Sequence, residues 1–265
     1  DPLLMLRQGP GIARLRAWDS AWAMAARHMR DARLRAAFSV QPLLLGGDPY
    51  GATGLYAMIT ELERRYGVWT PLGGVAALAA AIGGLLADSG VALRLGETVE
   101  RVLIARGRAA GVALAGGERL PADLVVWAGD PTRLYRDALP EGVGGWRARR
   151  LARRGRQSMG VFLLYLGVER DCADLAQHTI RLSPRHRDHM RAVFGAGRLS
   201  DDPSLYLHRA GATDPGRAPA GCDALYALCP VPNLGAGIDW DDATPRLRET
   251  LLDTLERAIA PGLRD

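Results

Sequence analysis

Apolar residues recur at helical spacing in two long stretches of the chain. Residues 11–37, "GIARLRAWDSAWAMAARHMRDARLRAA", place arginine and aspartate between them, which predicts one amphipathic helix or a helix pair. Residues 244–263, "TPRLRETLLDTLERAIAPGL", show the same pattern, and Thr244 followed by Pro245 predicts the N-cap and first position of a helix. Helices are also expected from Thr53 to a stop at Gly67 and within residues 131–157.

Short apolar runs bounded by glycine-rich turns occupy much of the remaining chain and predict strands. In the middle of the chain these runs are residues 91–95, 98–104, 109–114 and 124–127, and they follow a helix of small residues that stops at Gly90. Further along, "SMGVFLLYLGV" (158–168) is the strongest buried-strand signal, and "SLYLHRA" and "ALYALCPVPNL" predict two more strands.

The order of these elements predicts an α+β or α/β fold class. We expect a mixed sheet built from residues 161–167, 204–208 and 224–229, with helices packed on one face, and a small α/β lobe at residues 68–130. A length of 265 residues, with 48% hydrophobic and 24% charged residues, allows one large globular domain or two ordinary ones.

The charge of the chain narrows the kinds of partner. The sequence contains no lysine, so all its basic side chains other than histidine are arginine, and the net charge is +5. This balance favours an anionic surface, either lipid headgroups or nucleic acid. "RARRLARRGR" (147–156) is either a solvated helix face or a contact with lipid headgroups, while nucleic acid is disfavoured because no aromatic residues interleave the run.

Cysteine usage predicts a reducing environment and no metal site. Cys172, Cys222 and Cys229 form no CxxC pair and have no histidine at metal-ligand spacing, so we interpret them as reduced and mostly buried. No run reaches the roughly 18 consecutive apolar residues of a membrane span, and no secretory signal opens the chain. The first residue is Asp1 rather than methionine, and we expect the chain to be a fragment.

A glycine pair, Gly73-Gly74, precedes the helix of small residues. By itself it predicts a tight turn, or a helix start close to an anion, and it does not complete a GxGxxG fingerprint. The longer run changes this interpretation, because the pair is part of a series: Pro71, Gly73-Gly74, Gly90, Val99, Val102, Gly116-Gly117 and the stretch from Ala122 to Ala128. This series resembles the flavoprotein family that includes amine oxidases and carotenoid desaturases.

Within that family the chain resembles bacterial phytoene desaturases over nearly its whole length. The motifs are "GGDPYGATGLYAMITELERRYGVWTPLGG", "SMGVFLLYLGV" and "DPSLYLHRAGATDPGRAPAGC". Asp48 stands where asparagine is more usual, and Gln177 stands where a second histidine is common. The resemblance implies FAD-dependent removal of hydrogen from adjacent carbons of a long polyene such as phytoene in carotenoid biosynthesis, with a hydride passing to the flavin.

The resemblance also implies which residues form the site. Those on the flavin side are Pro71, Gly73, Gly74, Val99 and Ala128, with the Val99 strand against the adenine end of FAD. A tunnel for a polyene needs apolar walls, and six residues around Gly46-Gly47 offer one unless they are packed in the core: Leu43, Leu44, Leu45, Leu55, Tyr56 and Ile59. The candidate catalytic residues are Arg7, expected near the flavin, and His178, with His208 and Asp239 as alternatives.

The implied domain organisation is discontinuous. Residues 1–67 form a helical part associated with substrate and membrane, residues 68–130 the middle segment of a glutathione-reductase-like FAD-binding domain, and residues 131–265 the substrate domain. The N-terminal GxGxxG unit and the C-terminal FAD motif of the family are absent from these 265 residues. The chain alone is therefore expected neither to hold FAD tightly nor to turn over, and the 68–130 lobe should expose apolar surface.

The implied partners are a long apolar polyene and membrane lipids, contacted peripherally at the cytoplasmic side of the cell membrane. The Trp18–Trp22–Met29 face is either core or a part that dips into the lipid interface. The oligomeric state stays open. The alternative functions are a flavin-free module that binds carotenoids or lipids, a related carotene isomerase, and a desaturase of shorter polyenes.

Overall fold

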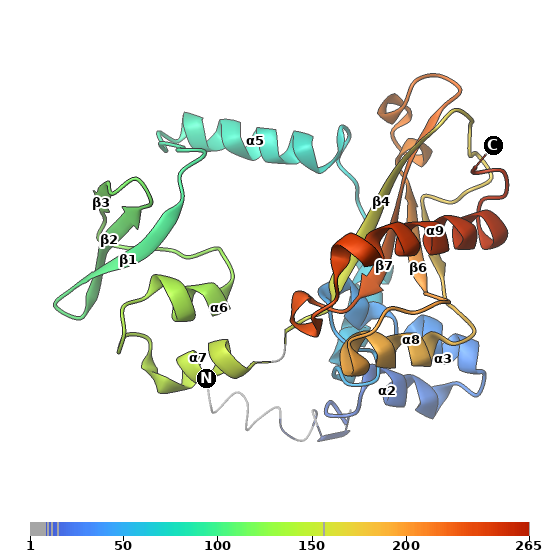
Figure 1. Ribbon diagram of the computed structural model, residues 1–265, viewed down its shortest axis with the longest axis horizontal. Helices are drawn as coiled ribbons and strands as arrows, with labels where there is room; N and C mark the ends of the chain where they lie inside the picture. Colours follow the sequence, from blue (N-terminus) through green and yellow to red (C-terminus); the bar gives the residue numbers. More distant parts are fainter. Residues whose placement is uncertain (1–8, 10, 12, 15, 156, 265) are drawn as a thin grey trace. The chain divides into compact units, whose positions relative to one another are not determined.

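The computed structural model describes Gly9, Gly11, Ala13, Arg14, and residues 16–155 and 157–264 (Figure 1). The chain forms two compact units. The first contains residues 1–78 and 158–265, and the second contains residues 79–157.

The first unit is built on a four-stranded sheet with the order β4-β7-β6-β5. Its strands are β4 (Gly160–Val168), β5 (His178–Arg181), β6 (Leu205–Arg209) and β7 (Asp223–Val231), and all three neighbouring pairs are antiparallel. The three strands expected from the sequence are confirmed. β5 is an additional strand, which lies in a histidine- and arginine-rich segment that gives no clear strand signal.

Helix α9 (Trp240–Ala258) covers one face of this sheet and closes the main core (Figure 1). The core residues from the strands alternate with residues that face away, as a pleated strand requires. The core residues that come from β6, β7 and α9 include Leu205, Leu207, Leu225, Ala227, Cys229, Leu247, Leu251 and Leu255. Cys172 and Cys229 are buried and none of the three cysteines is in a disulfide, as expected.

The start of α9 differs from the sequence-based prediction. The N-cap is Asp239, whose Oδ1 accepts hydrogen bonds from the amides of Asp241 (3.1 Å) and Asp242 (3.4 Å). Thr244 and Pro245 therefore lie inside the helix. The earlier start is favoured because two carboxylates in the first turn complement the positive helix end, whereas Pro245 removes only one backbone donor.

The amino-terminal part of the first unit is helical. The expected helix pair is confirmed as α2 (Ala21–His28) and α3 (Ala32–Phe38), and the next helix is confirmed as η2 (Gly54–Tyr56) followed by α4 (Ala57–Tyr66), which ends at Gly67 with φ 74°. Between them, η1 (Gln41–Leu45) ends at Gly46, which has a φ of 76°. A Cβ added there would lie 2.8 Å from Cβ of Ser158, so the close approach to the start of β4 also requires glycine.

Short elements complete the first unit. They are α8 (His186–Arg191), η4 (Ala192–Ala196), η5 (Ala210–Ala212), η6 (Pro215–Arg217) and η7 (Leu234–Ala236). Helix α5 (Gly74–Asp88) begins in the first unit and continues into the second.

The second unit contains a small antiparallel sheet with the order β1-β2-β3. Its strands are β1 (Val99–Ala105), β2 (Arg108–Leu114) and β3 (Arg119–Pro121), and the helical segments α6 (Pro131–Arg133), η3 (Leu134–Ala138) and α7 (Gly145–Arg154) follow. Two of the strands expected here, residues 98–104 and 109–114, are confirmed with shifts of one residue.

The strands expected at residues 91–95 and 124–127 do not form, so that prediction was wrong. Both segments are apolar, but neither has a strand to pair with among the residues that the structure describes. A strand is stable only when a neighbour satisfies its backbone groups. Leu95 and Val126 are each 81% exposed, and no residue of α5 is buried, which confirms the expected apolar surface in this lobe.

Candidate functional site

The face of the large sheet opposite α9 carries a row of rings, called here the ring row: Tyr165, Tyr226, His208 and His178. They come from β4, β7, β6 and β5 in that order, so the row crosses the whole sheet. Successive side chains of a strand point to opposite faces of the sheet, which explains why these rings share one face. Since Leu207 and Leu225 point into the core, the neighbouring His208 and Tyr226 must point to the other face.

The strand register brings these rings into contact. Tyr165 pairs with Tyr226, Tyr226 with His208, and His208 with His178. The ring centroids of these pairs lie 6.0, 4.9 and 5.1 Å apart. Tyr206 lies on the same face, and its hydroxyl is 2.7 Å from Nδ1 of His178. This hydrogen bond fixes the orientation of the His178 ring.

Burial and neighbouring charges hold His208 in its neutral form. Its pKa is lowered first by burial and then by the positive charges of His178 and Arg217. Its Nδ1 atom is buried and has no hydrogen-bond partner among the described residues. The pKa of Tyr206 is raised, chiefly by burial, so this phenol stays protonated and can donate or accept a hydrogen bond. The row therefore offers a neutral imidazole beside a phenol.

Three members of this arrangement were missed by the sequence analysis: Tyr165, Tyr206 and Tyr226. A signal was present, because tyrosine or histidine occupies alternate positions of "LYLHR" and the middle of "FLLYLGV" and "DALYALC". Alternation shows that such residues share a face of their own strand. Only the register between strands shows that they meet.

A second part of the site is the glycine turn, residues 70–74, which touches the loop after β6. The amide of Gly73 donates a hydrogen bond to Oδ2 of Asp214 (2.8 Å), and Nη1 of Arg217 donates to the carbonyl oxygen of Gly73 (2.9 Å). Nε2 of Gln177 donates to Oγ1 of Thr213 in the same loop (2.8 Å). Because Gln177 precedes His178, these contacts place the glycine turn near the His178 end of the ring row.

The glycine turn suits one side of a flavin. Gly73 and Gly74 have φ values of 78° and 73°, a backbone that other residues rarely adopt, so the turn presents main chain rather than side chain. It leads directly into α5, and the first amides of a helix have no acceptor within the helix. The amide of Gly73 already donates to Asp214 and that of Gly74 to the carbonyl oxygen of Pro71, so an electron-rich ring or an anionic group could be met there only by the amides that follow.

The other predicted flavin-side residues belong to the second unit or are partly covered. Pro71 is half-buried before the glycine turn. Val99 opens β1 and is half-buried, and Ala128 is exposed after the irregular segment 124–127. Their assignment to FAD remains a prediction, since Val99 and Ala128 are in a different unit from the glycine turn.

The six residues predicted to form a tunnel wall lie in η1, η2 and α4. Leu44, Leu45 and Leu55 are 62%, 65% and 51% exposed, so core packing does not account for them. Leu43, Tyr56 and Ile59 are half-buried. A hydrogen bond from Nε2 of Gln41 to Oγ1 of Thr60 (2.8 Å) holds η1 against α4. The exposed leucines are accessible to an apolar ligand.

The candidate catalytic residues have separate outcomes. Arg7 lies outside the described residues. His178 is in the ring row, and His208, considered as an alternative, is beside it. Asp239 is the N-cap of α9, a role that accounts for its carboxylate without any catalytic part.

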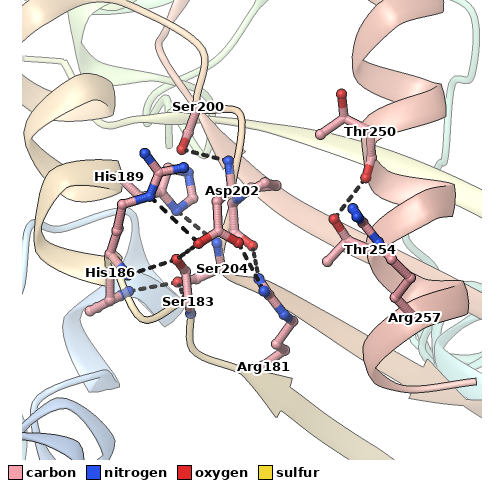
Figure 2. Close-up of polar contacts among 12 residues, drawn as sticks. Arg181, Ser183, His186, His189, Ser200, Asp202, Ser204, Thr250, Thr254 and Arg257 are labelled. Atoms are coloured by element: carbon pink, nitrogen blue, oxygen red, sulfur yellow. Dashed lines mark hydrogen bonds and ion pairs between the residues drawn. The ribbon is translucent and has the colours of Figure 1, made fainter.

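A separate polar cluster lies between β5, α8 and β6, and Figure 2 shows it centred on Asp202. Ser183 and Arg181 donate hydrogen bonds to Asp202, which lowers the pKa of its carboxyl even though burial opposes the charge. Oγ of Ser204 accepts from the amide of Ser183 (3.0 Å) and lies 2.8 Å from Nδ1 of His186.

This polar cluster is structural. Ser183 and Ser204 are only 4% and 3% exposed, so neither hydroxyl is open to a substrate. Nδ1 of His189 accepts from the amide of Ser204 (3.0 Å), so its Nε2 carries the hydrogen that is donated to the carbonyl oxygen of Pro230 (3.1 Å). Apart from Nε2 of His186, which has no partner among the described residues, the serines and histidines therefore satisfy one another and the backbone.

Comparison with known proteins gives a consistent family assignment. Residues 20–221 match the family model described as flavin containing amine oxidoreductase. The chain is 40% identical over 262 residues to phytoene desaturase (lycopene-forming) of Pseudescherichia vulneris, which covers 98% of this chain and 53% of that protein. It is 36% identical over 263 residues to phytoene desaturase (neurosporene-forming) of Rhodobacter capsulatus, covering 97% of this chain and 50% of that one.

The chain thus spans about half the length of the curated relatives it matches. Among solved structures, an oxidoreductase from Methanosarcina mazei superposes with a TM-score of 0.67 at 15% identity, over 97% of this chain and 57% of that chain. At this identity the superposition supports the fold, and the sequence relatives carry the family.

Proposed function

Because the chain belongs to the flavin containing amine oxidoreductase family, we propose that it supplies the substrate side of an FAD-dependent enzyme that desaturates a C40 polyene such as phytoene. The reaction would be a step of carotenoid biosynthesis. The proposal concerns the protein as a whole, since the relatives are about twice as long as this chain.

The observation that carries the proposal is the face of the large sheet with the ring row. Four rings cross four strands, a span of roughly 15 Å at the usual spacing between strands. Val161 and Leu163 of β4 are on the same face as Tyr165 and are 48% and 38% exposed. A polyene has no polar group to bind, so contact with apolar side chains and ring faces must provide its affinity.

The two histidines of the ring row could take part in the proton balance. FAD, when bound, accepts a hydride from one carbon of the substrate. A proton must leave the neighbouring carbon, and a neutral imidazole can accept it. His208 meets this condition because its pKa is lowered, and the hydrogen bond between Tyr206 and His178 orients the His178 ring beside it. Pro71, Gly73 and Gly74 would hold one side of the flavin.

The experiment that tests this function uses the full-length protein, purified and supplied with FAD and with phytoene in liposomes. We expect products with longer conjugated systems, followed by their visible absorbance. A flavin-free carotenoid-binding protein would retain polyene but form no product. A carotene isomerase would change the geometry of a polyene without extending its conjugation. A shorter-polyene desaturase would extend a C30 substrate faster than phytoene. Each of these results would replace the proposal.

We also propose that the protein binds peripherally to the cytoplasmic side of the membrane through α7. The arginines of α7 form no ion pair with any residue that the structure describes. Arg147 lies over the ring of Trp146, 5.4 Å from its centroid, and Trp146 is 67% exposed. Exposed tryptophan beside arginine is typical of the interface of an anionic membrane. No helix in the described ranges is long and apolar enough to span a bilayer.

A vesicle-binding assay tests this contact. Arg147, Arg150 and Arg154 line one surface hollow with Trp146, and replacing the three with glutamine should weaken binding to vesicles containing phosphatidylglycerol roughly 100-fold, at about 1 kcal/mol per arginine. The matched control replaces three other arginines with glutamine: Arg101, Arg106 and Arg108, which are exposed in the same unit. An equal loss in the control would show that only net charge matters.

A further inference from the structure

The glycine turn is held by hydrogen bonds to both backbone polar groups of one residue, Gly73. The amide of Gly73 is held by Asp214, and its carbonyl oxygen is held by Arg217. Both side chains belong to one short segment, Asp214–Arg217, called here the DPGR loop. Asp214 is 141 residues and Arg217 is 144 residues from Gly73 in the sequence. Because both hydrogen bonds are made to backbone atoms of Gly73, they do not depend on the side chains of the turn.

The DPGR loop has a closed conformation of its own, which suits it to restrain the glycine turn. Pro215 starts η6, and the amide of Arg217 donates to the carbonyl oxygen of Asp214 (3.1 Å), so the segment is closed on itself. No ion pair joins Asp214 to Arg217 in the described part of the chain, which leaves both charges for the backbone of Gly73. Charged groups make the stronger hydrogen bonds to a neutral backbone.

The glycine turn, in contrast, needs an external restraint. Two consecutive glycines lose more conformational freedom on ordering than any other pair. Both have positive φ, and the guanidinium of Arg217 lies so close to Gly74 that an added Cβ would be 2.9 Å from Nη2. The DPGR loop therefore fixes the point from which α5 begins.

We propose that Asp214 and Arg217 are positioning residues, which lock the glycine turn beside the ring row so that the flavin and the polyene meet in a fixed geometry. This inference rests on the proposed function, because it gives the glycine turn a flavin to hold. Neither residue touches the reacting atoms in the proposal. Both act through Gly73.

The test uses the full-length protein and four variants: D214A, D214N, R217A and the control R198A. The side-chain amide oxygen introduced by D214N can still accept the hydrogen bond from Gly73, whereas the methyl group left by D214A cannot. Arg198 is exposed and makes no side-chain hydrogen bond with the described residues. FAD affinity is measured by titration, and amide hydrogen exchange is measured in the peptide that contains Gly73.

We expect D214A and R217A to weaken FAD binding about 10-fold, the usual cost of losing one hydrogen bond to a charged group, and to speed exchange at Gly73. D214N should stay within about 3-fold of the wild type, since the acceptor is kept. R198A should match the wild type. Rescue by D214N separates a positioning role from a requirement for the negative charge.

The outcomes distinguish the two proposals. If the wild type binds FAD and both alanine variants bind it equally well with unchanged exchange at Gly73, the positioning role is wrong. If D214N fails as badly as D214A, the hydrogen-bond argument is wrong. If the full-length wild type binds no FAD at all, the proposed function itself fails.

Discussion

The imidazole of His186 is enclosed in the polar cluster of Figure 2. It is 5% exposed, and its Nε2 atom finds no partner among the described residues. Burial is the main cause that lowers its pKa from 6.5 to about 4, and the nearby imidazole of His189 adds to the effect because two protons on the pair would repel each other. The ring is therefore neutral in the folded protein at neutral pH, and a proton on it would have to be buried without compensation.

This burial predicts acid sensitivity of the first unit. The folded-state pKa of His186 lies below the unfolded value, so the unfolded chain takes up a proton first as the pH falls. Stability should be fully present above pH 6.5 and decline toward pH 4, by up to about 3 kcal/mol from this group. Urea unfolding between pH 7.5 and 4.5 measures it.

A pair of variants assigns the acid sensitivity to one residue. H186Q should flatten the dependence of the unfolding free energy on pH, although it lowers stability overall. H28Q serves as the control, because His28 is exposed at the end of α2 and its loss should leave the slope unchanged. An unchanged slope in H186Q would contradict the assignment.

At the scale of elements, the start of α9 gives a discriminating prediction. If Asp239 is the N-cap, D239A should destabilise the unit by about 1 kcal/mol, because two amides lose their acceptor. T244A should change stability by less than about 0.5 kcal/mol, since Thr244 lies exposed inside the helix. Thermal unfolding of both variants decides whether α9 is capped by Asp239 or by Thr244. A larger loss of stability in T244A than in D239A would show that Thr244 is the cap.

The elements predicted well from the sequence are those whose partners are near in sequence or whose pattern is strong. The hairpin of β1 and β2 formed as expected, because each strand finds the other across a two-residue turn. Residues 91–95 and 124–127 carry an equally apolar pattern, but their backbone groups have no neighbouring strand in the described chain. Periodicity predicts what a segment can form and not whether a partner is present.

The candidate site shows the same limit. His178 and the glycine turn could be singled out from local sequence and family resemblance. The ring row could not, because His178, His208 and Tyr226 meet only through the register of three strands. The hydrogen bond between Gly73 and Asp214 could not be predicted from the sequence either, because it joins residues 141 positions apart.

At the scale of the whole molecule, the residues assigned to the flavin are divided between two units. The glycine turn belongs to the first, and Val99 and Ala128 belong to the second. The second unit exposes apolar side chains in α5 and in the two irregular segments, among them Leu85 (65%), Leu95 (81%) and Leu124 (77%). Large apolar side chains exposed in such number are usually covered by another part of the protein.

This arrangement predicts how the 265-residue chain behaves by itself. No GxGxxG unit occurs in its sequence, so the dinucleotide would lack the strand–turn–helix cradle that binds its diphosphate. We expect the isolated chain to bind FAD at least about 100-fold more weakly than the full-length protein, the difference that some 3 kcal/mol of lost contacts produces. Fluorescence titration with FAD measures both, and D214A in the full-length protein sets the scale of a single lost contact. Stoichiometric binding of FAD by the isolated chain would contradict the prediction, because the glycine turn and the second unit would then be sufficient for the cofactor.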